Sequence, residues 1–128
     1  MPQRTKADRP LSPHLQVYRL PLTAILSILH RITGVGLSVG LLMLTWFLFS
    51  LASGPAAYGL FAAFAGSIIG KLMILGWAAA LAYHACSGVR HLFLDTGSMF
   101  DVRTAYSVGY AVIAASVILL AIFVLAAQ

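Results

Sequence analysis

The side chains best suited to chemistry in this sequence are two histidines, His84 and His91, in the stretch from Tyr83 to Asp95. A spacing of seven residues is nearly two helical turns, so both rings face the same side, about 10.5 Å apart along the axis. A histidine inside a lipid-embedded helix is costly and usually functional. Neutral imidazole is a good axial ligand of haem iron. We therefore predict that His84 binds a haem iron; the alternative is a structural hydrogen bond to a neighbouring helix.

A second polar group consists of Ser27, His30 and Arg31. Their spacing of i, i+3 and i+4 places them on one helix face. An arginine there can stabilise an anion, such as a haem propionate or a semiquinone, and a serine hydroxyl can donate to a quinone carbonyl. The alternative is that Arg31 reaches lipid phosphates and His30 lies at the interface. Three polar side chains on one face favour a binding site.

The elements that position these side chains are predicted to be membrane-spanning helices. Of the 128 residues, 61% are hydrophobic and 9% charged, whereas about 25% charged residues is typical of soluble domains. We predict an all-α integral membrane protein that forms a single domain over residues 1–128. The single cysteine excludes a disulfide within the chain and any multi-cysteine zinc or iron–sulfur site.

Three spans are expected after a polar N-terminal arm. No charged residue occurs from Ile32 through Gly70, a tract too long for one span of about 20 residues and interrupted at Ser53-Gly54-Pro55. Gly97 is suited to cap the second helix at its C-terminus, and Asp101 to cap or pair within the following connection. The expected segments are the arm over residues 1–20 and spans over residues 22–51, 60–94 and 104–126.

The basic residues predict the orientation. Five of the eight lie near the N-terminus: Arg4, Lys6, Arg9, Arg19 and Arg31. Arg90 and Arg103 flank the connection between the second and third spans. The positive-inside rule then places the N-terminus and this connection in the cytoplasm. With no signal peptide or presequence pattern, a bacterial inner membrane is favoured, and the lipid-compatible remainder argues against a nucleic-acid partner.

The depth of the residues along the helices guides the assignment of ligands. His84 lies about 15 Å from the expected helix end near Leu94. Gly88, one turn on, leaves room for a flat porphyrin, and Arg90 and His91 lie at a depth suited to its propionates. His30 is expected to be too near the end of its helix to oppose His84. The second axial ligand should therefore come from a partner chain, with haem bridging two subunits.

Three motifs together resemble the cytochrome b556 family of succinate dehydrogenase, the large membrane anchors of respiratory complex II. The motifs are Arg9-Pro10-Leu11-Ser12-Pro13-His14, Ser27-Ile28-Leu29-His30-Arg31-Ile32-Thr33-Gly34 and His84-x3-Gly88-x-Arg90-His91-x3-Asp95. The last two are specific in combination, and their order and the three-span frame cover nearly the whole chain. The third span matches only as a generic apolar helix.

The resemblance implies that His84 is an axial ligand to haem b and that a second, smaller anchor subunit supplies the other histidine. It implies that His30 and Arg31 lie near the propionates, and that Ser27 and Arg31 line a ubiquinone site facing the iron–sulfur subunit. Electrons would come from succinate through FAD and iron–sulfur clusters held in the flavoprotein and iron–sulfur subunits. This chain would not be an enzyme by itself.

Two other functions remain open at this point. The anchor of a quinol:fumarate reductase would run the same electron path in reverse. A haem-free structural or transport protein with three spans belongs to a different class and predicts neither haem nor a partner.

Overall fold

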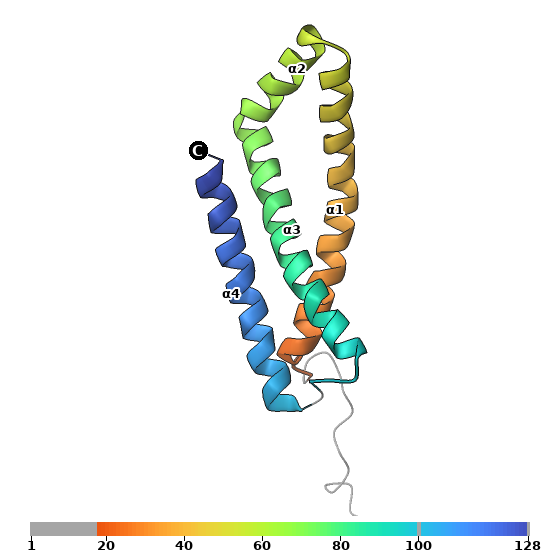
Figure 1. Ribbon diagram of the computed structural model, residues 1–128, viewed down its shortest axis with the longest axis vertical. Helices are drawn as coiled ribbons and strands as arrows, with labels where there is room; N and C mark the ends of the chain where they lie inside the picture. The colour runs from red at the N-terminus through yellow and green to blue at the C-terminus, as the bar shows by residue number, and fades with distance from the viewer. Residues whose placement is uncertain (1–17, 100, 128) are drawn as a thin grey trace, which may run out of the picture.

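A computed structural model describes residues 18–99 and 101–127, which form four helices (Figure 1). Three of these helices are long and apolar enough to cross a membrane, which confirms the predicted all-α fold with three spans. The Arg9–His14 motif and most of the expected N-terminal arm lie outside the described residues. The helices are α1 (Leu22–Ala52), α2 (Pro55–Gly66), α3 (Ile68–Asp95) and α4 (Val102–Ala126).

The prediction of one continuous helix over residues 60–94 is wrong, because the chain breaks at Ser67 between α2 and α3. Ser67 has an extended backbone (φ −68°, ψ 161°), and its hydroxyl accepts a hydrogen bond from the Gly70 amide at 3.1 Å. Serine is a favoured N-cap because it satisfies such an amide. The backbone folds tightly here, since a Cβ on Gly70 would lie 2.8 Å from the Cα of Ala65. The turn therefore requires glycine at position 70.

Helix α3 packs against both α1 and α4 and diverges from α1 toward the end where α2 joins them (Figure 1). At the opposite end all three helices meet. The Tyr83 hydroxyl of α3 donates to the Leu26 carbonyl oxygen of α1 at 2.7 Å. Gly109 of α4 lies against Leu26, because a Cβ there would be 2.9 Å from the Leu26 Cδ1. These contacts fix the three helices at the level of the predicted site.

The connection between α3 and α4 follows the predicted cap chemistry. Gly97 has φ 80° and its amide donates to the Leu94 carbonyl at 3.0 Å, as expected of a glycine that ends a helix. Asp101 caps α4 by accepting a hydrogen bond from the Thr104 amide at 3.1 Å. The end of α3 and the start of α4 are therefore specified locally.

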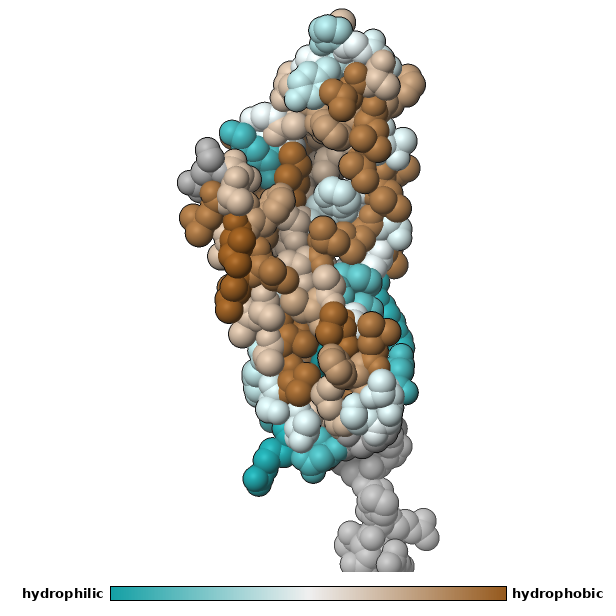
Figure 2. Space-filling model, viewed as in Figure 1, coloured by the Kyte–Doolittle hydropathy of each residue, from teal (hydrophilic) through white to brown (hydrophobic). Residues whose placement is uncertain are grey.

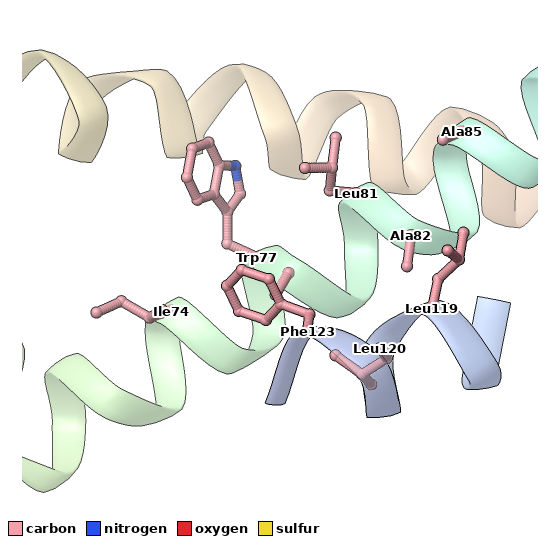
Figure 3. Close-up of a pocket in the computed structure, with 9 residues that line it drawn as sticks. Ile74, Trp77, Leu81, Ala82, Ala85, Leu119, Leu120 and Phe123 are labelled. Atoms are coloured by element: carbon pink, nitrogen blue, oxygen red, sulfur yellow. The ribbon is translucent and has the colours of Figure 1, made fainter. Parts of the chain in front are cut away.

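Farther along, α3 and α4 enclose an apolar groove of about 340 Å³ (Figure 3). The indole of Trp77 reaches from α3 toward α1. Gly40 of α1 leaves room for it, because a Cβ there would lie 2.6 Å from the Trp77 Cε2. The groove is lined by Ile74, Trp77, Ala78, Leu81, Ala82, Ala85, Leu119, Leu120 and Phe123.

Little apolar surface is buried within the chain itself. Among the described residues, only Leu26 and Val112 are buried hydrophobic side chains. Hydrophobic residues cover much of the visible face, and hydrophilic ones lie at the lower end and along part of the right side (Figure 2). Lys71, at the far end of α3, is exposed. Such a surface requires lipid or other helices around it.

Candidate functional site

Three histidine rings form a stack where α1 crosses α3. His30 of α1 lies between the other two rings, with its centroid 4.0 Å from that of His84 and 4.6 Å from that of His91. The rings are close to parallel, at 10° and 22° respectively. The predicted common face of His84 and His91 is therefore the face that receives His30. His30 was expected to lie too near the end of its helix to oppose His84 as a second ligand; the crossing of the two helices brings the two rings to the same level, where they stack.

Hydrogen bonds define the tautomer of a neutral His84 ring. Its Nδ1 lies 3.0 Å from the His30 carbonyl oxygen and 3.2 Å from the Thr33 Oγ1. A carbonyl oxygen only accepts, so Nδ1 carries the proton and donates. The Thr33 hydroxyl donates in turn to the Leu29 carbonyl at 2.8 Å. In a neutral ring this leaves the Nε2 of His84 with a free lone pair, the state in which histidine binds a metal.

Gly34 gives the His84 ring its space. A Cβ at this position would lie 3.1 Å from the Cε1 of His84, tighter than an ordinary contact. Gly88 lies beside the stack with more space, since a Cβ there would be 3.7 Å from the Cε1 of His30, an ordinary contact. Gly34 of α1 therefore makes room for the His84 ring, whereas the role expected of Gly88 was to leave room for a porphyrin.

His91 and His30 have different partners. The Nδ1 of His91 donates to the Ser87 carbonyl of its own helix at 2.7 Å. The Nδ1 of His30 is buried and has no hydrogen-bond partner among the described residues. A buried polar nitrogen left unpaired costs about 1–3 kcal/mol. The stack is therefore incomplete without a further polar group.

Ser27 and Arg31 lie on α1 beside His30. Ser27 is half-buried and Arg31 is exposed. Both therefore remain accessible to a ligand or partner at the same end of the bundle. In the described part of the chain, no group of three or more histidine, cysteine, aspartate or glutamate side chains fits a bare metal ion.

Arg90 and His91, expected at the same depth suited to the haem propionates, point to different sides of α3. Arg90 lines a groove between α3 and α4, whereas His91 contacts His30 of α1. Consecutive residues point about 100° apart around a helix. Arg90 and His91 are neighbours in the sequence and therefore lie on different faces of α3.

Two site residues were not singled out by the sequence. Thr33 and Gly34 hold and accommodate the His84 ring. Both lie inside the Ser27–Gly34 motif. The motif marked this part of α1 as functional. It did not show that Thr33 contacts His84, which lies 51 positions away in the sequence.

Comparison with known proteins identifies the family of the chain. Residues 5–123 match the family described as succinate dehydrogenase/fumarate reductase transmembrane subunit. The chain belongs to this family. It is 44% identical over 114 residues to the succinate dehydrogenase cytochrome b556 subunit of Paracoccus denitrificans, covering 89% of this chain and 88% of that protein.

More distant relatives carry related descriptions. The cytochrome b556 subunit of succinate dehydrogenase from Rickettsia felis is 39% identical, over 87% of this chain and 86% of its own. The mitochondrial cytochrome b560 subunit of Mus musculus is 31% identical, over 91% and 70%. The predicted resemblance is confirmed. The chain is a membrane anchor of the succinate dehydrogenase cytochrome b type, and its long apolar helices and bacterial relatives support a bacterial membrane protein.

Proposed function

We propose that this chain is the haem b-binding anchor of a succinate:ubiquinone oxidoreductase and helps to form its quinone-reduction site. The observation that carries the proposal is the state of His84. Its Nδ1 proton is committed to the His30 carbonyl at 3.0 Å, which leaves Nε2 free to coordinate iron. The unpaired Nδ1 of His30 also calls for a further polar group at this place.

Haem b, when bound, supplies a one-electron carrier. The chain's own residues would hold it: His84 would ligate its iron, and His30, Arg31 and His91 would bind its charged propionates. His30 stacks face to face on His84 at 4.0 Å. Parallel stacked rings do not direct their lone pairs at one another, so His30 is unsuited to be the opposite ligand. The second ligand would come from the smaller anchor subunit, completing a larger helical bundle around the shared haem.

Ser27 and Arg31 would form the quinone site. The Ser27 hydroxyl donates to a ubiquinone carbonyl oxygen, and the Arg31 guanidinium stabilises the negative charge that develops on reduction. Both lie within the first three turns of α1, beside the arm that the positive-inside rule places in the cytoplasm. Protons and the iron–sulfur subunit would approach from that side of a bacterial inner membrane.

The remaining chemistry would belong to the partners. FAD and the iron–sulfur clusters would reside in the flavoprotein and iron–sulfur subunits, with this chain non-catalytic by itself. The family description also includes fumarate reductase anchors, in which electrons run from quinol to fumarate. The named cytochrome b556 relatives are subunits of succinate dehydrogenase, which favours quinone reduction.

An absorption spectrum of the purified assembly tests the haem assignment. Reduction with dithionite should reveal the α-band of a b-type haem. Its absence would refute haem binding and favour a haem-free three-span protein.

The Arg31→Ala variant tests the quinone site. Loss of the guanidinium should slow ubiquinone reduction at least about tenfold, about 1.4 kcal/mol of transition-state stabilisation. Succinate oxidation with an artificial acceptor should remain near the wild-type rate. Arg103→Ala removes an exposed arginine of α4 and serves as the control. Equal losses in both assays would count against a quinone role.

A further inference from the structure

Two neighbouring side chains of α3 reach the backbone of α1 at successive turns. The Tyr83 hydroxyl donates to the Leu26 carbonyl oxygen at 2.7 Å. The His84 Nδ1 donates to the His30 carbonyl oxygen at 3.0 Å. The two accepting carbonyls are four residues apart, which is about one turn and about 6 Å along the axis of α1. Both hydrogen bonds therefore depend on the same crossing, and a shift of α1 that breaks one bond also changes the geometry of the other.

The bond made by Tyr83 is the firmer of the two. Its length of 2.7 Å is that of a good hydroxyl hydrogen bond, and its acceptor belongs to Leu26, whose side chain is 1% exposed. The contact of His84 is longer and shares its acceptor, because the Thr33 hydroxyl also lies 2.9 Å from the His30 carbonyl oxygen. Tyr83 is therefore the stronger attachment of α3 to α1, and the bond of the proposed ligand is the one more easily lost.

Helix α4 supports the crossing from the other side. A Cβ on Gly109 would lie 2.9 Å from the Leu26 Cδ1 and 3.3 Å from the Leu22 Cδ2. The Leu26 side chain is enclosed, so it cannot yield into open space, and pressure on it passes to its own backbone. The carbonyl on that backbone is the acceptor for Tyr83. Gly109 of α4 is thus connected through Leu26 to the crossing that orients the histidine.

We propose that Tyr83 is a positioning residue for His84, whose hydroxyl holds α1 where the His30 carbonyl accepts the Nδ1 proton of the ligand ring. The inference rests on the proposed binding of haem by His84. A hydrogen bond from Nδ1 makes the imidazole a stronger electron donor to a bound metal, which favours the oxidised iron. When the crossing loosens, this bond weakens. The iron then keeps its ligand but becomes easier to reduce.

A redox titration of haem in the purified complex of the Tyr83→Phe variant tests the proposal. A net hydrogen bond is worth about fivefold in an equilibrium constant, and the two oxidation states share part of that effect. The ratio of reduced to oxidised haem at a fixed potential should therefore rise about threefold, a midpoint shift of about 28 mV, with haem content near that of the wild type. Tyr110→Phe removes a tyrosine hydroxyl from an α4 residue that is 62% exposed and should leave the midpoint unchanged. An unchanged or lower midpoint in Tyr83→Phe, or an equal shift in Tyr110→Phe, would overturn the proposal. Absence of haem from the wild-type complex would instead refute the proposed function.

A second variant, Gly109→Ala, decides the matter even if Tyr83→Phe fails to assemble. It leaves Tyr83 and His84 in place and adds a methyl group against Leu26. The midpoint should shift in the same upward direction as in Tyr83→Phe. Gly36→Ala adds the same methyl group to α1 where it meets no other atom within 4 Å and serves as the control. A loss of thermal stability in Gly109→Ala without any shift of the midpoint would show that these contacts only hold the helices together.

Discussion

The two packed faces of α3 hold their nitrogen-bearing side chains in opposite ways. On the face toward α1, His84 and His91 each donate a proton to a backbone carbonyl, at 3.0 Å and 2.7 Å. On the face toward α4, Arg90 is buried as a permanent cation, and its Nε has no partner in the described part of the chain. The first face presents imidazole rings held by backbone carbonyls, and the second presents a positive charge with no counterion in the described part of the chain.

The difference shows what one chain of this size can do alone. Helices contain many backbone carbonyls, so the chain itself can orient a histidine ring and fix its tautomer. A buried arginine, in contrast, needs an anionic group as counterion, which the backbone does not provide. Each face is thus half of a site, but the missing halves differ. We expect haem on the face of α3 toward α1 and a counterion for Arg90 on the face toward α4.

The largest effect on the face of α3 toward α1 is expected from His84→Leu. Loss of the axial ligand should abolish haem binding, so the b-type α-band per mole of complex should fall to background. His91→Leu is the matched control and should retain most of the haem. Wild-type haem content in His84→Leu would refute the ligand assignment.

A smaller effect is expected from Gly34→Ala. The added Cβ would lie 3.1 Å from the His84 Cε1, and overpacking of this kind costs about 1–3 kcal/mol. Haem occupancy and the midpoint of thermal unfolding should both fall. Gly36→Ala adds the same methyl group to α1 at a position where it meets no other atom within 4 Å and should behave like wild type. The prediction fails if the two alanine variants are indistinguishable.

The smallest expected effect is that of Thr33→Val. It removes the 3.2 Å contact to the His84 Nδ1 while the His30 carbonyl still accepts the proton. The change should cost about 1 kcal/mol or less and should shift the haem band or potential slightly. Thr45→Val removes a hydroxyl that bonds only to its own helix, at the Leu41 carbonyl. An equal shift in that control would show that Thr33 has no special relation to the histidine.

Sequence reasoning captured those aspects of the fold that depend on local pattern. Hydropathy and length predict the three spans, and helical spacing places His84 and His91 on one face. The break at Ser67 was missed because α2 and α3 are both apolar, so hydropathy does not mark their boundary. Its signal is a single serine hydroxyl that caps Gly70.

The site was less accessible because it depends on the angle at which two helices cross. The contact between His30 and His84, and the roles of Thr33 and Gly34, arise from packing of α1 on α3. Spacing along one helix carries no information about that packing. The separation of Arg90 from His91 has the same origin, since only the neighbours of α3 determine what each face meets.

The length of α1 bears on the energetics of electron transfer. From His30 to the end of the helix at Ala52 is about 33 Å, slightly more than the hydrocarbon thickness of about 30 Å. The histidine stack therefore lies close to one surface of the membrane. Moving an elementary charge across the full bilayer involves about 2.3 kcal/mol per 100 mV, but a reaction confined to this level crosses little of that voltage drop. The proposed quinone reduction at this level should proceed at nearly the same rate in energised and de-energised membranes.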